Sequence, residues 1–375
     1  MTHVRQLLSL PSTSCPNGVD GPVQTEFSST PIAFGVRFPP CGSARAVADA
    51  VALSERKGFD VAWIADSQLL WRDVFATMAL AATATEHITL ASAVTNFVTR
   101  HPSVVASAAN TVNELAPGRV LLGVGTGDSS VKPLGMRPSR LAEMRDGIAM
   151  VRTLLADEVQ DYGQRRAKLR APVSPVPVHI AASGPRSLRM AGEVADGVLT
   201  LAGISPETMS GTRDAVAAGA AAAGRDITDL AFTVGAFCKI TEDIERDAAI
   251  LKPICLHMAS IGGQDFLRLA GIELPPPPAV PEVYPDMVHA EDWDLAVAQA
   301  GRYVTDEMAV RFSQTFCLFG TVEEVLSRIR RAVDVGATGF YLRHVGNYTL
   351  PIELVETFGD EVLPHFSAAV SGVRP

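Results

Sequence analysis

The sequence predicts an α/β protein that forms a single (β/α)8 barrel, the TIM-barrel fold. Short, continuously apolar segments alternate with longer amphipathic segments from residue 31 onward, a pattern that indicates parallel strands covered by helices on both faces. About eight such strands can be counted, which favours a closed barrel. The turn after the first strand, Pro39–Gly42, lacks the glycine pattern of a dinucleotide-binding open sheet.

Each strand is predicted from a short apolar run, and each helix from an amphipathic period with capping residues at its ends. Prolines bound the first strand on both sides, and Gly58 ends the first helix. The expected strands are Ile32–Phe38, Val61–Ile64, Ile88–Thr95, Val120–Val124, Val178–Ala181, Val198–Leu201, Phe232–Lys239 and Gly339–Leu342. The expected helices are Ser43–Lys57, Asp73–Thr85, His101–Leu115, Arg140–Leu155, Pro185–Ala195, Pro206–Ala223, Ile244–His257, Val322–Val335 and Glu353–Val370.

Two segments fall outside the alternation. Residues 1–30 are rich in Ser, Pro, Gly and Thr without a clear period, and we expect an N-terminal tail before a barrel of residues 31–375. A proline-rich insertion at about 259–316, which contains Pro275–Pro278, precedes the last strand–helix unit. Long insertions of this kind form lids or binding elements in some barrels. A surface excursion or a dimer contact is an equally good interpretation.

The composition narrows the class of partner. The formal net charge is −9, whereas a nucleic-acid-binding face is basic. No apolar run approaches the ~20 residues of a membrane span. The five cysteines are scattered and form no CxxC pair, which argues against a disulfide framework or a metal site and favours reduced thiols in a cytoplasmic protein.

Glycine-rich segments follow the fourth and fifth predicted strands. Gly123–Ser130 has three glycines at alternate positions, so its backbone can approach a ligand closely and its N–H groups can face an anion. In Ala181–Ser187, Pro185 suits the first position of a helix whose free N–H groups would face the barrel mouth. Each segment alone is equally typical of a turn or a helix cap.

Polar residues follow the second and third predicted strands. Asp66-Ser67 stands where barrel enzymes keep reactive groups, although a helix cap is the alternative interpretation. Thr95 and Asn96 can hydrogen-bond the edge of a heteroaromatic ring. His101 before Pro102 is more typical of a helix start than of a catalytic base.

These segments, together with Ala191–Val198, resemble the bacterial-luciferase superfamily, and most of all its methylenetetrahydromethanopterin reductase branch, which uses the deazaflavin coenzyme F-420. The resemblance implies a non-prolyl cis peptide at Ala93–Val94 against the coenzyme ring, and a coenzyme phosphate between the two glycine-rich loops. The expected coenzyme contacts are Ala93, Val94, Thr95, Asn96, Gly125, Thr126, Gly127, Asp128, Ser129, Ala182, Ser183, Gly184, Pro185 and Arg186. Because Asp128 is acidic, we expect it to orient backbone or hydroxyl groups. The resemblance also suggests a homodimer.

The sequence departs from that branch at Ser67, where the reductases commonly have histidine. A serine hydroxyl can donate a hydrogen bond but is no acid near neutral pH. The candidate catalytic residues are Asp66, Ser67 and Asn96. The expected activity is hydride transfer between F-420 and a small organic substrate, with a separate reductase supplying the reduced coenzyme. An FMN-dependent monooxygenase using reduced flavin and O2, or a coenzyme-binding barrel without turnover, are the alternatives.

Overall fold

The computed structural model describes residues 32–279 and 281–367. The predicted tail and the end of the last predicted helix lie outside the described residues. Eight parallel strands close into a ring, because the last strand pairs with the first and Ala33 lies opposite Gly339. In ring order they are β1 (Ala33–Phe38), β2 (Val61–Ile64), β3 (Thr89–Ser92), β4 (Val120–Val124), β7 (Val178–Ala181), β8 (Gly197–Thr200), β9 (Ala231–Ile240) and β11 (Gly339–Arg343). The predicted (β/α)8 barrel is confirmed.

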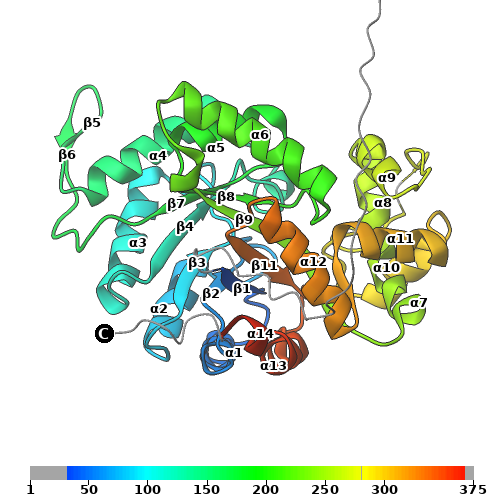
Figure 1. Cartoon of the computed structure of the whole chain (residues 1–375). Coiled ribbons are helices and arrows are strands. Elements are labelled where there is room, and N and C mark those ends of the chain that lie inside the picture. The colour runs from blue at the N-terminus through cyan, green and yellow to red at the C-terminus, as the bar shows by residue number, and fades with distance from the viewer. Residues whose placement is uncertain (1–31, 280, 368–375) are drawn as a thin grey trace, which may run out of the picture. The chain divides into compact units, whose positions relative to one another are not determined.

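Helices surround the ring of strands (Figure 1). They are α1 (Ala44–Arg56), α2 (Val74–Ala82), α3 (Pro102–Leu115), α4 (Leu141–Leu155), α5 (Pro185–Val194), α6 (Pro206–Ala222), α12 (Val322–Asp334), α13 (Ile352–Glu361) and α14 (Pro364–Ser367), with short 3-10 turns η1 (Lys132–Leu134) and η2 (Ile227–Asp229). Side chains on one face of each strand, such as Val36 on β1, pack against these helices in the main core. The other face points inward, where Trp63, Leu121 and Tyr341 form a separate cluster.

Several elements differ from the prediction. The helix expected over Ile244–His257 is divided into α7 (Ile244–Asp247), a 3-10 turn η3 (Ala248–Leu251) and α8 (Lys252–Ser260). Pro253 stands in the first turn of α8, where a missing N–H costs nothing. The helix expected over Glu353–Val370 is also divided, because α13 ends at Glu361 and Pro364 begins α14. The third strand ends at Ser92 rather than at Thr95, which forms only an isolated bridge with Val124.

The chain after α8 forms further helices: α9 (Gln264–Leu269), α10 (Trp293–Ala300) and α11 (Asp306–Phe316). They group with α8 at one side of the strands (Figure 1) and share an apolar cluster that includes Leu256, Phe312 and Phe316. A short strand β10 (Leu318–Gly320) then pairs with β9 outside the ring, and β5 (Gln160–Asp161) and β6 (Arg166–Ala167) form a hairpin. The role of the insertion as a lid or a dimer contact stays a prediction.

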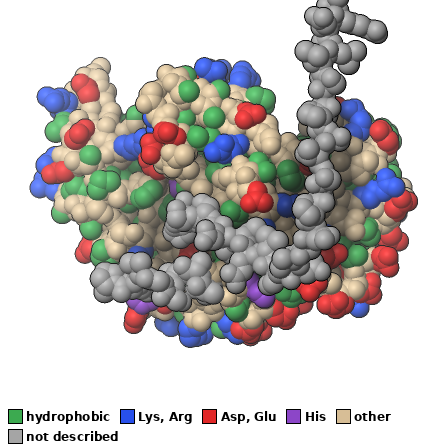
Figure 2. All heavy atoms as spheres, in the orientation of Figure 1, with side chains coloured by type: hydrophobic (Ala, Val, Ile, Leu, Met, Phe, Trp, Pro, Cys, Tyr) green, Lys and Arg blue, Asp and Glu red, His purple; other side chains and the backbone are tan. Residues whose placement is uncertain are grey.

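Surface charge is mixed on the face that Figure 2 shows, where lysine and arginine side chains lie among aspartate and glutamate side chains. Among the described residues, no helix has the length and apolar character needed to cross a membrane. Across residues 32–279 and 281–367, no group of three or more His, Cys, Asp or Glu side chains is arranged to hold a metal ion.

Candidate functional site

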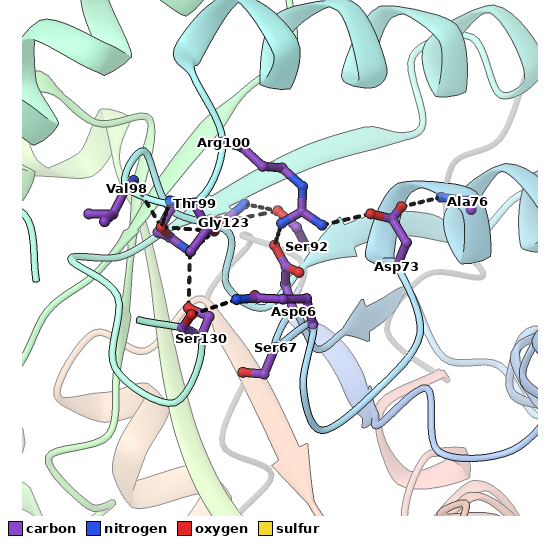
Figure 3. Close-up of polar contacts among 12 residues, drawn as sticks. Asp66, Ser67, Asp73, Ala76, Ser92, Val98, Thr99, Arg100, Gly123 and Ser130 are labelled. Carbon is purple, nitrogen blue, oxygen red and sulfur yellow. Dashed lines mark hydrogen bonds and ion pairs between the residues drawn. The ribbon is translucent and has the colours of Figure 1, made fainter. Parts of the chain in front are cut away.

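Four loops follow the carboxyl ends of neighbouring strands β2, β3, β4 and β7, where barrel enzymes build their sites. The predicted site residues lie on these loops. Hydrogen bonds and ion pairs link the first three loops to one another, and Figure 3 shows the polar contacts around Asp66, Arg100 and Ser130. The structure therefore brings residues that are far apart in sequence to one end of the barrel.

An arginine lies between two carboxylates at the end of β2 (Figure 3). Asp66 is only 5% exposed, and its Oδ2 accepts a hydrogen bond from Arg100 Nη1 at 2.5 Å. Arg100 Nη2 donates to Asp73 Oδ2 at 2.7 Å, and Asp73 also caps the start of α2 by accepting from the Ala76 N–H. Arg100 is therefore held on both sides, and it fixes the orientation of the Asp66 carboxyl group.

The second carboxyl oxygen of Asp66 is unpartnered. Burial raises the pKa of Asp66, and the Arg100 guanidinium opposes this rise. Asp66 Oδ1 and Thr95 Oγ1 are both buried without a hydrogen-bond partner, although the Thr95 hydroxyl is near enough to help lower the Asp66 pKa. Asp66 and Thr95 therefore form one buried polar pair at the mouth, to which a ligand could add a hydrogen bond.

Asn96 is fully engaged within the protein. Its Oδ1 accepts from the backbone N–H groups of Val98 and Thr99, each at 2.9 Å. Its Nδ2 donates to Thr99 Oγ1 at 3.1 Å and to Ser130 Oγ at 3.0 Å. This side chain therefore shapes the loop after β3 and joins it to the loop after β4. Direct contact of Asn96 with coenzyme or substrate stays a prediction.

Two side chains join the loop after β2 to the loop after β4. Ser67 Oγ and Ser129 Oγ share a hydrogen bond at 2.6 Å, and Gln68 Nε2 donates to the Ser130 carbonyl at 2.7 Å. Ser67 is 2% exposed. Ser67 therefore has a definite partner, and it holds the glycine-rich loop in position.

Glycine is required where β4 passes the loop after β3. The Ala93–Val94 peptide is cis, as the resemblance implied. A Cβ at Gly125 would lie 2.8 Å from Val94 Cγ2, and a Cβ at Gly123 would lie 2.1 Å from the Ser92 carbonyl oxygen. Side chains at these positions would displace the segment that carries Val94. The glycine-rich motif thus permits the close packing of β4 against that segment.

The rest of the loop after β4 presents backbone and small side chains. Gly127 has a φ of +89°, a left-handed conformation that favours glycine. Thr126 and Ser129 are half-buried. Asp128 is exposed and pairs with Lys132 at the following turn; its role beside a bound coenzyme stays a prediction.

The start of α5 has no capping side chain. Its N-cap is Gly184, with φ −88° and ψ 152°, and Pro185 follows at the first helical position. Ser43, Ser205 and Thr321 cap α1, α6 and α12 by accepting backbone N–H bonds. Ser183–Arg186 are exposed, whereas Ala182 is buried. Because β7 pairs with β4, this helix start lies beside the glycine-rich loop and offers N–H groups to an anion.

Sequence reasoning missed the partners that complete the site. Arg100 and Ser130 are not among the predicted site residues, although Arg100 pairs with Asp66 and Ser130 accepts a hydrogen bond from Asn96. The available signal was their place on the same loops: Ser130 directly follows Ser129, and Arg100 follows Asn96 by four residues. The pairing itself depends on how the loops meet in space.

The family model for luciferase-like monooxygenases matches residues 19–339. The 5,10-methylenetetrahydromethanopterin reductase of Methanolobus tindarius is 29% identical over 314 residues, which cover 81% of this chain and 92% of that protein. The F-420-dependent glucose-6-phosphate dehydrogenase of Beutenbergia cavernae is 39% identical over 198 residues, or 48% of this chain and 59% of that protein. The solved structure of a coenzyme F-420-dependent tetrahydromethanopterin reductase from Methanopyrus kandleri has the same fold, with a TM-score of 0.70 at 22% identity over 90% of this chain and 100% of that chain.

Proposed function

Because this chain belongs to the luciferase-like monooxygenase family, we propose that it transfers a hydride between coenzyme F-420 and an organic substrate in the barrel mouth. The observation that carries the proposal is the uncapped start of α5 beside the glycine-rich loop after β4. Relatives that are named for F-420 or for a reductase support the deazaflavin.

The loops after β4 and β7 fit the phosphate of such a coenzyme. Gly127 and Gly184 leave the backbone open to close approach, and Thr126, Ser129 and Ser183 add hydroxyl groups, which suits the binding of an anion. Ala93, Val94 and Thr95 would lie along the ring. When bound, the coenzyme supplies the hydride or accepts it, and the protein's part is orientation and exclusion of water.

Asp66 is the residue that we assign to the reacting end of the site. Its Oδ2 is held by Arg100, so its free Oδ1 has a fixed direction. The pKa of Asp66 is raised by burial, which favours the protonated form more than in an exposed aspartate. Asp66 can therefore hold a proton for the substrate, or accept a hydrogen bond from it, together with the Thr95 hydroxyl. Ser67 supports this arrangement through Ser129.

An FMN-dependent monooxygenase is the second candidate, because the matched family is named for monooxygenase activity. Such an enzyme takes reduced flavin from a separate reductase and consumes O2. A deazaflavin enzyme would have its coenzyme reduced by a separate enzyme as well, but its hydride transfer has no oxygen requirement. The two candidates therefore differ in a measurable reactant.

The test incubates the purified protein with reduced F-420 or reduced FMN and a panel of organic acceptors. We expect reduced F-420 to be oxidised under anaerobic conditions only when an acceptor is present. The absorbance of the coenzyme measures this oxidation. Oxygen consumption that requires both reduced FMN and an organic substrate, without anaerobic turnover of F-420, would contradict the proposal and favour the monooxygenase.

A further inference from the structure

Two arginines lie side by side on neighbouring strands at the carboxyl end of the barrel. Val36 on β1 is opposite Leu342 on β11, so the next residues, Arg37 and Arg343, are adjacent across the ring. Val36 and Leu342 both belong to the outer core between strands and helices. Since side chains alternate along a strand, Arg37 and Arg343 point to the interior of the barrel.

The positive charge of this pair is not balanced by a carboxylate. Arg37 is 4% exposed, its Nη2 donates to the neutral Asn347 Oδ1 at 2.8 Å, and the Tyr341 hydroxyl is close enough to raise the pKa of both arginines. Arg343 Nε is buried without a partner. In the described part of the chain, no aspartate or glutamate is among the charged neighbours of either arginine. Buried charges are normally paired, and Arg100 at the same end of the barrel has two carboxylates.

Aromatic rings give these arginines only partial compensation. The Arg37 guanidinium lies 5.0 Å from the centroid of the Trp71 ring, and that of Arg343 lies 4.3 Å from the centroid of the Phe237 ring. Such contacts orient a guanidinium but leave its charge and most of its donors available. Burial lowers the pKa of Arg37 to about 10, and the neighbouring Arg343 charge adds to this effect. An anion between the two side chains would offset both the burial of the two positive charges and their mutual repulsion.

The position of the pair separates it from the predicted phosphate loops. In the ring, β11 and β1 stand across the barrel from β4 and β7, with two strands between them on each side. A coenzyme whose phosphate lies at β4 and β7 would reach toward the axis from that side. The arginine pair then faces the remaining part of the mouth, where a substrate would lie.

We propose that Arg37 and Arg343 bind an anionic group of the substrate, a carboxylate or a phosphate, and so restrict the enzyme to anionic substrates. This inference rests on the proposed function. A guanidinium presents its donors in a planar fork that matches carboxylate and phosphate oxygens. Two such groups side by side, both held in place by aromatic rings, form a pre-oriented receptor for one anion.

The test uses calorimetry to measure binding of three compounds to the full-length protein: propionate, inorganic phosphate and the neutral propionamide. Each titration is done in the presence and in the absence of F-420. We expect saturable binding of propionate or phosphate and none of propionamide; the stronger of the two anions identifies the chemical class. Arg343→Met and Arg37→Met should each weaken anion binding at least tenfold and leave F-420 affinity within threefold. Arg343→Lys should weaken it less than Arg343→Met, and the exposed Arg330→Met on α12 should behave as the unaltered protein.

Arg343→Met should fold, because it removes a buried charge whose Nε has no partner. The inference would be overturned if neither anion binds the unaltered protein. It would also be overturned if Arg343→Met and Arg37→Met bind the anions as tightly as the unaltered protein does. Loss of F-420 binding in these variants with anion binding intact would also overturn it. Absence of F-420 binding to the unaltered protein would instead overturn the proposed function alone, since the anions are titrated without coenzyme as well.

Discussion

A serine in place of Gly184 would change stability and coenzyme binding in opposite directions. Gly184 is the N-cap of α5 and has φ −88° and ψ 152°. Ser43, the N-cap of α1, has φ −65° and ψ 150° and accepts a hydrogen bond from the Ala46 N–H at 3.1 Å. The conformation at Gly184 therefore suits a serine that accepts from the Ser187 N–H.

The two effects of Gly184→Ser can be estimated separately. The new cap contributes a few tenths of a kcal/mol relative to glycine, and restriction of the unfolded chain contributes about 0.4–1 kcal/mol. A Cβ at this position meets no atom closer than Ser187 Oγ at 3.7 Å, so the substitution introduces no clash. We expect the free energy of unfolding to rise by about 0.6–1.4 kcal/mol, the sum of the two contributions.

Coenzyme affinity should fall, because the introduced hydroxyl occupies an N–H that would bind phosphate and the Cβ blocks close approach of the anion. We expect at least a tenfold rise in the Kd for F-420, or about 1.4 kcal/mol. Urea denaturation and fluorescence titration measure the two quantities. Gly211→Ala inside α6, where a Cβ meets nothing within 4 Å, is the control: it should stabilise the protein and leave binding unchanged. A stabilised Gly184→Ser protein with unaltered F-420 affinity would refute a phosphate site at α5.

Two further predictions concern the site, and a third concerns His179, a buried side chain on β7. Gly125→Ala should displace Val94, whose Cγ2 would be 2.8 Å from the new Cβ, and should weaken F-420 binding at least tenfold in the same titration; unchanged affinity would count against a ring at Val94. Asp66→Asn should reduce steady-state turnover about 10²-fold or more with F-420 affinity within threefold, and full turnover would remove Asp66 from the mechanism. Burial lowers the pKa of His179 to about 4 from 6.5, so the unfolded chain binds the proton more strongly and stability is lost as pH falls from 6.5 toward 4. Between pH 7 and pH 5, the free energy of unfolding of His179→Gln should therefore fall by about 2 kcal/mol less than that of the unaltered protein, as measured by urea denaturation. An equal fall in both proteins would show that His179 is not the group responsible.

Much of the barrel follows from local sequence because parallel strands buried on both faces must be continuously apolar. Val61–Ile64, Val120–Val124 and Val178–Ala181 were predicted with the bounds that the structure has. Helix starts are similarly local, and His101 caps α3 by accepting from the Ser103 N–H, as its position before a proline indicated. Short-range periodicity and capping therefore account for the order of strands and helices.

Other features depend on tertiary contacts. The three-residue strand β10 is defined by pairing with Cys238–Ile240 and has no period of its own. The polar hairpin of β5 and β6 lacks an apolar signal for the same reason. Pro253 was not recognised as a helix start because the apolar pattern continues through it. These elements needed the assembled fold to be identified.

The candidate site shows the same division. Asp66 and the glycine-rich loops could be selected from sequence because strand ends in a barrel share one edge. The pairing of Asp66 with Arg100, and of Ser67 with Ser129, joins loops that follow different strands. No spacing in the sequence determines which donor meets which acceptor. The arginine pair on β1 and β11 is separated by most of the chain and becomes visible only when the ring closes.

Titration of the purified protein with F-420 and, in parallel, with FMN tests the central claim most directly. The two coenzymes have distinct absorbance spectra, so each bound form can be identified after removal of free ligand. The account predicts saturable, stoichiometric binding of F-420, and weaker binding by Gly184→Ser. Failure of F-420 to bind, whether or not FMN binds, would contradict it.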